Sequence, residues 1–532
     1  MAAVGLLALA SVSRAQEDLT LERLEAEGAV VGDIVYDIHD VFETDEAEED
    51  RRLYRIANRL HVLTRRSTIR AQMLLRPGDP FSKRKLEESE RLLRSNRYLS
   101  EAFIRPTRYD NGVVDLTVMT RDNWTLLPRL SYSREAGETK YTFGFEEQNF
   151  LGGGAQLKVE RSSDPDRRST LFEFTDRNLG RTWLGLGVGY RDSDDGNAQF
   201  FRINRPFFSL DERWAAGFEI GHDDRVEPLY SRGDTVAKYR DDARHVSTWF
   251  GWSDGLVDNW VSRFTIGMAF RDDDFAEAED PDFPDVIPES RTSIYPFVRY
   301  QRIENRFAVA QNLNQIVRPE DLQLGTEFSA GLGFAAATFG SDQDRWLFDA
   351  ALRMTRGTPE KALLIGQAAI DGRLDGSDPT NVLVTLQAEY FRRQSERRLL
   401  YGSITARAGH DLDLDNPVIL GGETGLRGYE RAFGNGESNV VATLEQRYFT
   451  NWYPWRLFRV GGAVYVDAGR TFGEDVTGRS DSRWLANIGF GLRLGSTRAD
   501  SNKVFHFDLA FPLVRDDGTD EVQVIIEGRR GF

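Results

Sequence analysis

The feature that most constrains this chain is an alternation of apolar with polar or small residues, which starts after Asp122 and continues to the C-terminus. The alternating part divides into about twenty strand-like segments of roughly 9–14 residues, separated by turns rich in Gly, Asp, Asn and Ser. No helical periodicity interrupts these segments. In residues 182–192, glycines occupy one face, and the other face carries Leu184, Leu186, Val188 and Tyr190.

Two segments near the C-terminus show what each face contains. Aromatic and aliphatic residues form one face: Ile488, Phe490, Leu492 and Leu494, then Phe505, Phe507, Leu509 and Phe511. Charged or amide residues form the other: Asn487, Arg493, His506 and Asp508. In a soluble sandwich the apolar faces would pack against each other. A membrane barrel turns them toward lipid, and its polar lumen keeps the mean hydropathy low, here -0.48. We therefore predict a transmembrane antiparallel β-barrel over 123–532, with a soluble propeller or sandwich as the alternative.

Composition excludes several classes of function. The net charge of -17 argues against nucleic acid as a partner. The chain has no cysteine and six scattered histidines, so we expect neither a metal site nor a cofactor. No Ser-His pair stands out on an inward face, and we expect no enzymatic activity.

The N-terminal residues 1–15 resemble an export signal, because Val4 to Val12 form a short apolar core and a small residue, Ala15, precedes the expected cleavage point. The signal lacks a basic start, so its first residues are expected to be missing. A disordered tail is the alternative. Residues 16–28 are charged and are predicted to form a linker or a short helix.

Residues 29–122 predict a small β-α-α-β-β domain with one extra helix. The first strand, 29–42, places Ile34, Tyr36 and Ile38 on one face. Helices are expected over 44–63, where Leu53, Ile56, Ala57 and Leu60 form an apolar stripe, over 65–75, and over 82–99. In the last of these, Ser82 is the expected N-cap, and Leu86, Leu93 and Leu99 are expected inside. Two short strands then meet at the turn Asp110-Asn111-Gly112.

The loop 421–437 contains the motif Leu426-Arg427-Gly428-Tyr429 between two strands. Alternation places Thr443, Glu445 and Arg447 on one face of the following strand, and Tyr465 and Asp467 on one face of the next. Two carboxylates this close repel each other, and a guanidinium can bind both. The gross attraction between the guanidinium and one carboxylate is about 4 kcal/mol at ~4 Å and an effective dielectric near 20. We therefore predict that Arg427 binds Glu445 and Asp467, that Gly425 and Gly428 let the loop turn tightly, and that Tyr429 packs on the barrel wall.

This motif, its two acidic strands and the preceding β-α-α-β-β domain resemble the BamA/TamA superfamily of outer-membrane barrel-assembly and transport proteins. The resemblance implies a POTRA-like periplasmic domain at 29–122, a sixteen-strand barrel where the pattern itself suggests about twenty, and a loop at 409–437 folded into the lumen. It implies a Gram-negative outer-membrane location. The implied partners are the outer-membrane bilayer, unfolded outer-membrane or secreted polypeptides, and a periplasmic protein bound at the POTRA-like domain. Some segments within 225–290 are expected to form plug or loop hairpins.

The two strands at the seam, where the first and last strands of the barrel meet, contain residues that weaken pairing. Pro128 cannot donate to a strand ladder, and the last strand contains Gly528 and Gly531 before the terminal Phe532. We interpret this as a seam that opens sideways and binds client strands by β-augmentation. The alternative is that Pro128 merely marks the start of its strand.

Other readings of these residues remain open. A phosphate-binding loop would need a Gly-Lys-Ser/Thr sequence opening a helix, which 421–437 lacks. A glycosidase-like pair of Glu445 and Asp467 would need one protonated carboxyl, which an arginine between them opposes. A solvated loop is the simplest alternative for 421–437. For the whole protein, the alternatives to insertion of outer-membrane proteins are secretion of one dedicated polypeptide and a passive pore.

Overall fold

The computed structural model describes residues 20–45, 49–135, 138–164, 166–280, 282–284, 286–479, 483–499, 504–515, 519–529 and 531. The expected export signal at 1–15 and the terminal Phe532 lie outside the described residues. The chain forms two compact units. The first contains the residues up to Leu127 together with 147–156 and 496–501, and the second contains the rest. None of the described helices is long and apolar enough to cross a membrane.

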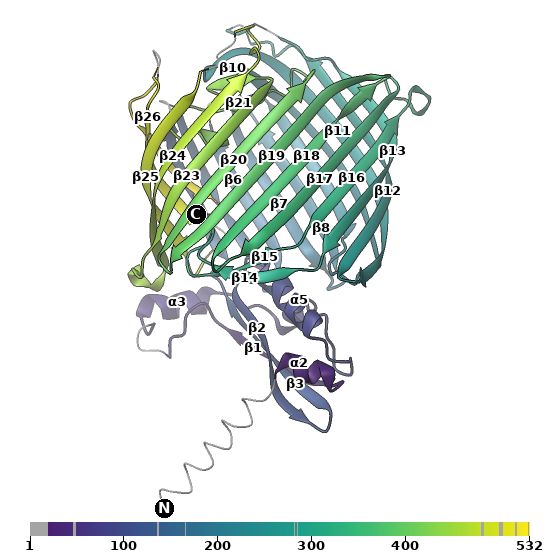
Figure 1. Ribbon diagram of the computed structural model, residues 1–532, viewed down its shortest axis with the longest axis vertical. Coiled ribbons are helices and arrows are strands. Elements are labelled where there is room, and N and C mark those ends of the chain that lie inside the picture. Colours follow the sequence, from purple (N-terminus) through teal and green to yellow (C-terminus); the bar gives the residue numbers. More distant parts are fainter. Residues whose placement is uncertain are drawn as a thin grey trace, which may run out of the picture. The chain divides into compact units, whose positions relative to one another are not determined.

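The described residues of the first unit form a three-stranded sheet and four helices. Figure 1 shows the sheet, β1 to β3, with α2, α3 and α5. In chain order the elements are α2 (Leu21–Ala26), β1 (Val30–His39), α3 (Arg52–Leu60), α4 (Arg66–Arg70), α5 (Lys83–Arg94), β2 (Leu99–Asp110) and β3 (Val113–Asp122). The central strand β3 pairs in parallel with β1 and antiparallel with β2. The turn between β2 and β3 has positive φ at Asn111 and Gly112, as expected for a two-residue hairpin. This is the β-α-α-β-β order predicted from the sequence.

The apolar core of the first unit lies between the sheet and the helices. It includes the predicted Leu86, Leu93 and Leu99, all at most 1% exposed. Ser82 is the N-cap residue of α5, but its side chain makes no capping hydrogen bond. The helices predicted over 44–63, 65–75 and 82–99 were all too long, because α3, α4 and α5 cover only Arg52–Leu60, Arg66–Arg70 and Lys83–Arg94. Leu99 therefore packs in the core as the first residue of β2 and not as part of a helix.

The apolar stripe predicted for α3 does not face the core of the first unit. Tyr54 is the buried residue of this helix. It stacks on Phe42 with ring centroids 4.2 Å apart, and Asn58 Nδ2 donates to the Phe42 carbonyl at 2.7 Å. These contacts fix the rotation of α3 and leave Leu53, Ile56 and Leu60 exposed.

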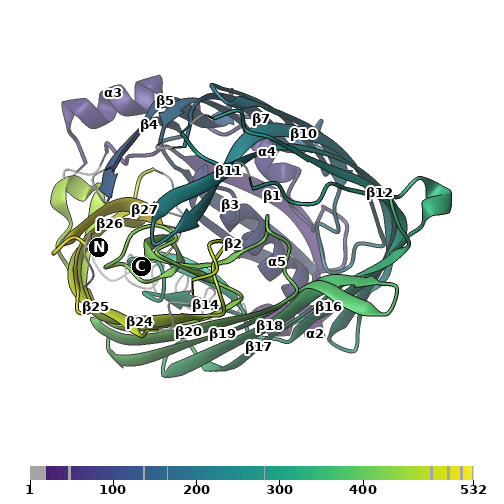
Figure 2. The ribbon, with the colours of Figure 1, turned by 90° about the horizontal axis from the view of Figure 1, so that it is seen from above.

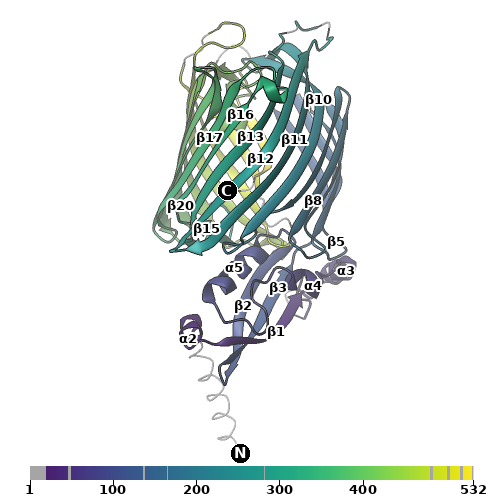
Figure 3. The ribbon, with the colours of Figure 1, turned by 90° about the vertical axis from the view of Figure 1, so that its right-hand side faces the viewer.

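The second unit forms a barrel (Figures 1 and 3). Its described residues include twenty barrel strands. The barrel strands are β4 (Leu126–Glu135), β5 (Glu138–Phe150), β6 (Ala155–Ser163), β7 (Arg168–Leu179), β8 (Leu184–Ser193), β9 (Gly196–Arg205), β10 (Trp214–Ser231), β11 (Asp234–Val257), β12 (Trp260–Ala276), β13 (Arg291–Glu304), β16 (Glu327–Ala335), β17 (Arg345–Thr358), β18 (Ala362–Asp375), β19 (Asp378–Ser395), β20 (Arg398–His410), β23 (Ser438–Phe449), β24 (Phe458–Phe472), β25 (Leu485–Ser496), β26 (Val504–Pro512) and β27 (Gln523–Arg529). Each is followed in the sheet by the next one in this order, and β4 follows β27. The pattern count of about twenty strands is confirmed, and the count of sixteen implied by the resemblance is wrong.

The faces of the barrel strands agree with the predicted alternation. Along β25, Ile488, Phe490 and Leu492 are exposed, whereas Asn487 and Arg493 are completely buried. The outward face is apolar on strand after strand, which a membrane barrel requires because lipid surrounds it. The predicted plug hairpins within 225–290 are not found among the described residues, because most of that range belongs to β10, β11 and β12.

Two segments between barrel strands fold into the barrel instead. The lumen hairpin, 305–326, joins β13 to β16 and contains β14 (Phe307–Gln311) and β15 (Pro319–Gln323). The motif loop, 411–437, joins β20 to β23 and contains β21 (Val418–Leu420) and β22 (Gly434–Gly436). Five successive strands, β16 to β20, separate the two segments, so they enter from opposite ends of the barrel. Figure 2 shows β14 within the ring of strands.

Candidate functional site

The motif loop is held in a compact shape by its own backbone. Leu420 pairs with Gly434 across the short ladder of β21 and β22. A single 3-10 turn, Gly422–Thr424, follows, and Gly425 closes it at φ 106°, in the left-handed region that favours glycine. The Gly421 N–H donates to the Thr424 hydroxyl at 2.8 Å. This turn presents Leu426 and Arg427 toward β23 and β24.

Arg427 binds both predicted carboxylates. Its Nε and Nη2 donate to the two oxygens of Asp467, each at 2.9 Å, and its Nη1 donates to Glu445 Oε2 at 2.9 Å. The guanidinium also lies over the ring of Tyr465, 3.2 Å from its centroid. All three charged side chains are at most 4% exposed. We call Arg427, Glu445 and Asp467 the arginine lock.

The lock is the centre of a larger buried network on neighbouring strands. Arg447 Nε donates to Glu445 Oε1 at 2.8 Å. Arg493 Nη1 donates to Asp508 Oδ1 at 2.6 Å, and its Nη2 lies 3.9 Å from Glu445 Oε2. The network thus contains three arginines and three carboxylates and is formally neutral. Such balance is what allows six ionic groups to remain buried, because an unpaired charge inside would cost several kcal/mol.

The two residues after Arg427 fix the loop on β25. The Gly428 N–H donates to Asn487 Oδ1 at 3.0 Å, and Asn487 Nδ2 donates to Asp467 Oδ2 at 2.8 Å. A Cβ at position 428 would lie 2.5 Å from Asn487 Cβ, so only glycine fits there. The Tyr429 hydroxyl donates to a carbonyl, with Ala486 O at 3.0 Å and Val514 O at 2.9 Å. Tyr429 therefore packs on the wall, as predicted, and also bonds to it.

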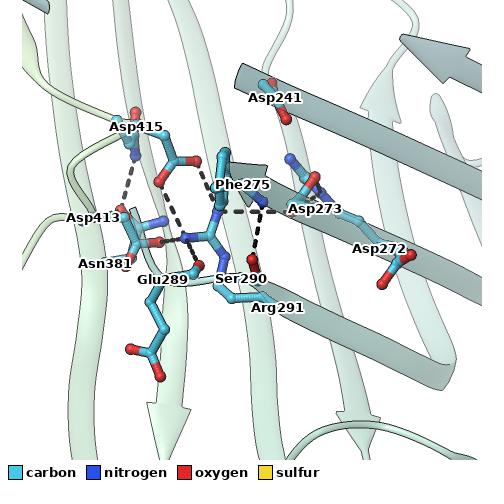
Figure 4. Close-up of polar contacts among 12 residues, drawn as sticks. Asp241, Asp272, Asp273, Phe275, Glu289, Ser290, Arg291, Asn381, Asp413 and Asp415 are labelled. Carbon is cyan, nitrogen blue, oxygen red and sulfur yellow. Dashed lines mark hydrogen bonds and ion pairs between the residues drawn. The ribbon is translucent and has the colours of Figure 1, made fainter. Parts of the chain in front are cut away.

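The beginning of the motif loop is bound to a different part of the barrel. Figure 4 shows Arg291 of β13 pointing at two loop aspartates. Arg291 donates to both oxygens of Asp415, at 3.1 and 2.7 Å, and lies 3.3 Å from Asp413. Arg373 of β18 also binds Asp413 through two bonds of 2.6 and 2.8 Å. The loop therefore joins strands β13 and β18 to strands β23, β24 and β25.

The lumen hairpin packs its apolar tip against the inside of the barrel. Leu313 and Ile316 are both 1% exposed. They belong to one apolar cluster with residues of six barrel strands: Leu363, Ile365, Phe391, Leu399, Phe449, Ala463 and Val504. Glu320 of β15 accepts backbone N–H groups from Leu313, Asn314 and Gln315 at 2.9 to 3.1 Å, and these bonds close the tip. The hairpin therefore reaches from β13 and β16 as far as β26.

One residue connects the hairpin to the arginine lock. Arg447, which binds Glu445, also donates through Nη1 to the Leu313 carbonyl at 2.6 Å. Glu445 in turn accepts from Arg427. A continuous chain of hydrogen bonds therefore runs from the motif loop through Arg427, Glu445 and Arg447 to the hairpin tip.

The lumen is not completely filled. A cavity of about 1040 Å³ is lined by residues of β11, β12, β13, β16, β17, β18 and β19 and by Asp415 and Asn416 of the motif loop. Its lining mixes arginines with carboxylates, including Arg263, Arg299, Asp273 and Asp349. Among the described residues no group of three His, Asp or Glu side chains could hold a metal ion.

The structure places two of the predicted seam residues, Pro128 and Gly528, in strands β4 and β27, which the sheet order makes neighbours, whereas Gly531 lies beyond the end of β27. Pro128 is the third residue of β4, and Gly528 of β27 pairs with Phe505 of β26. The Gly531 carbonyl accepts from His506 Nε2 at 2.7 Å. None of these contacts tests whether the seam opens sideways, so the opening stays a prediction.

Sequence reasoning missed the lumen hairpin and the second contact of Arg447, since a contact between segments 134 residues apart leaves no local pattern.

A comparison with protein-family models matches residues 372–527 to the Omp85 superfamily domain. The chain carries an Omp85 domain. This domain extends from the end of β18 into β27 and so contains the motif loop and the whole arginine lock. The resemblance to the BamA/TamA superfamily is confirmed over these residues, and this match together with the apolar outward face of the barrel indicates an outer-membrane location.

The similar proteins include a Treponema pallidum (strain Nichols) protein whose name describes an outer membrane protein assembly factor. It is 26% identical over an alignment of 191 positions, and the match covers 32% of this chain and 22% of that protein. This chain therefore spans about a fifth of that relative's length. Similar solved structures include CdiB from Escherichia coli, at 14% identity and a TM-score of 0.47 over 93% of this chain and 75% of that chain. BamA from Haemophilus ducreyi lacking POTRA domains 1-3 has 13% identity and a TM-score of 0.40 over 94% and 84%.

Proposed function

We propose that this protein inserts polypeptides into the outer membrane at the seam between β27 and β4. In this proposal the first unit is a POTRA-like domain on the periplasmic side, and an incoming client strand pairs with an open seam edge by β-augmentation. Client folding and burial of apolar surface supply the driving force, so the reaction needs no nucleotide or metal.

The observation that carries the proposal is the lumen hairpin. Its buried apolar tip packs in one cluster with residues of six barrel strands, and the Leu313 carbonyl at the tip is bound to Arg447 of the network. A polypeptide that passes through the lumen must displace this hairpin, at the cost of exposing Leu313 and Ile316 to water. A polypeptide that enters at the seam leaves the hairpin in place.

Secretion of a dedicated polypeptide through the lumen is the second candidate. The cavity of about 1040 Å³ favours it, because part of the barrel interior remains open and is lined with charged side chains. The name of CdiB adds no argument, since that structural likeness is weak.

A disulfide can separate the two functions, because the chain has no cysteine. A Cβ built on Gly495 of β25 lies 3.3 Å from Ile316 Cβ at the hairpin tip, near the spacing of a disulfide. The variant Ile316→Cys/Gly495→Cys would therefore fix the hairpin in the lumen when oxidised. The reduced form of the same variant is the matched control.

The experiment times the folding of an unfolded small outer-membrane barrel in liposomes that contain the purified protein. We expect folding faster than in empty liposomes, and the same rate for the oxidised and reduced forms. No acceleration by the wild type would refute the insertion function. Acceleration that disappears on oxidation and returns on reduction would favour a route through the lumen.

A further inference from the structure

Helix α3 exposes a stripe of large apolar side chains. Leu53, Ile56 and Leu60 are 67, 43 and 69% exposed. At about 100° per residue these three positions lie along one side of the helix. Val62 and Leu63, which follow directly, are also exposed. Five exposed apolar residues within eleven positions are unusual for a surface that faces only water.

The outward orientation of the stripe is fixed by contacts on the opposite side of α3. Tyr54 stacks on Phe42, and Asn58 both donates to and accepts from the Phe42 backbone, at 2.7 and 3.2 Å. His61 Nε2 lies 2.9 Å from the buried Asp122 carboxylate. One face of the helix is thus held against the rest of the first unit, and the apolar stripe lies on the other, exposed face.

The charge of this segment is opposite to that of the whole chain. Residues 51–70 contain seven arginines and no acidic residue, in a protein with a net charge of -17. Arg52, Arg55 and Arg59 lie on the side of the helix next to the apolar stripe, and all three are exposed. An apolar stripe bordered by arginines is the pattern of a helix that lies in the surface of an anionic membrane.

Both ends of this segment are tied to turns between membrane strands, within the same compact unit. Before the helix, the Val41 carbonyl accepts from Arg498 Nη1 at 2.9 Å, and Arg498 also binds Glu49. After the helix, the Arg65 N–H donates to the Gly152 carbonyl at 3.0 Å. Gly152 lies in the turn from β5 to β6, and Arg498 follows β25. Strands of a membrane barrel end near the bilayer surface, so the two turns that hold this segment are expected at the level of the lipid headgroups.

We propose that α3 is an interfacial helix that binds the bilayer at this end of the barrel. Leu53, Ile56 and Leu60 enter the boundary between headgroups and acyl chains, and Arg52 and Arg59 bind the phosphates of anionic lipids. In the sheet order, β26, β27, β4 and β5 lie between the two turns that hold this segment, so the seam between β27 and β4 lies between those turns as well. The proposal rests on the membrane location of the barrel and does not depend on the proposed insertion function.

The test uses the full-length protein in lipid nanodiscs. Leu60→Cys, the single cysteine of its chain, is labelled with an environment-sensitive fluorophore, and Val113→Cys, at the exposed turn between β2 and β3, is the matched control. In bilayers of phosphatidylethanolamine and phosphatidylglycerol, brominated lipids should quench the label at position 60 by at least about twofold and leave that at position 113 unchanged. Adding Arg52→Gln and Arg59→Gln should reduce this quenching.

Quenching at position 60 that equals that at position 113 would overturn the proposal and leave a protein partner as the occupant of this face. Quenching that the arginine substitutions do not change would overturn the binding of headgroup phosphates. A client-folding assay on the same samples keeps this result separate from the proposed function, because lipid contact at α3 and client folding are measured independently.

Discussion

Arg427 holds Asp467 through two parallel hydrogen bonds of 2.9 Å, a pairing that only a guanidinium can make. Its third bond, to Glu445, places one cation between two carboxylates of neighbouring strands. The contact fastens a loop from one end of the barrel to the network that also holds the lumen hairpin from the other end.

Replacing Arg427 by alanine should destabilise the barrel strongly. The network would keep three carboxylates but only two arginines, and the loss of one partner of a buried ion pair costs about 3–5 kcal/mol. We expect the folded form to unfold at a lower temperature in a heat-modifiability gel. Arg299→Ala is the control, because Arg299 is a half-exposed lumen arginine whose pair with Asp349 should contribute at most about 1 kcal/mol. An equal decrease in unfolding temperature for Arg427→Ala and Arg299→Ala would contradict the account.

Replacing Gly428 by alanine should loosen the motif loop without changing any charge. The new methyl group would lie 2.5 Å from Asn487 Cβ, so either the loop or β25 must move, at a cost of about 1–3 kcal/mol. Limited proteolysis should then cut within 411–437. Gly366→Ala in β18 is the matched control, because a Cβ at Gly366 would lie 4.0 Å from its nearest neighbouring atom, the Met354 carbonyl oxygen. A Gly428→Ala barrel as resistant as the control would show that this close packing is not required.

Removing the lumen hairpin should open the pore. Residues 307–323 can be replaced by Asn-Gly, since Leu324 N already donates to the Arg306 carbonyl at 2.7 Å and two residues can close such a turn. Single-channel conductance in planar bilayers should be larger for this variant than for the wild type. The oxidised Ile316→Cys/Gly495→Cys variant should keep the low conductance. An unchanged conductance after the deletion would mean that another segment closes the lumen.

Replacing Arg447 by methionine should weaken the attachment of the lumen hairpin to the barrel wall while keeping a long apolar side chain at this position. Arg447 Nη1 donates to Leu313 O at 2.6 Å, and its loss also leaves Glu445 with one fewer partner. We expect more frequent channel openings than in the wild type, although the hairpin is still present. Arg353→Met, which removes a bond of 3.0 Å to Gln323 near the base of the hairpin, is the control. Channel openings that become more frequent only in Arg353→Met would show that the hairpin is held in the lumen at its base rather than at its tip.

Local patterns were sufficient to predict the barrel and the arginine lock. Period-two alternation assigns Glu445 and Asp467 to the lumen, and a motif with one arginine between glycines supplies their partner. The faces of β25 and β26 follow from the same rule, including the buried Arg493 and Asp508.

The features that were missed depend on contacts between distant segments. Nothing in the sequence of 305–326 shows that Leu313 belongs to an apolar cluster inside the barrel rather than to a lipid-facing strand. In α3 the spacing of Leu53, Ile56 and Leu60 indicated an amphipathic helix correctly, but periodicity does not distinguish an apolar face that packs in a core from one that meets a membrane. The stacking of Tyr54 on Phe42 decides that orientation.

The most direct test of the central claim is to locate the client during insertion. Single cysteines can be placed at Leu130 on the outward face of β4, beside the seam, and at Ser247 in the wall of the lumen cavity. A client barrel with one cysteine in its last strand is arrested during folding in liposomes and oxidised. The account predicts a disulfide with position 130 and none with position 247. A disulfide formed only with position 247 would contradict it, because the client would then be passing through the lumen.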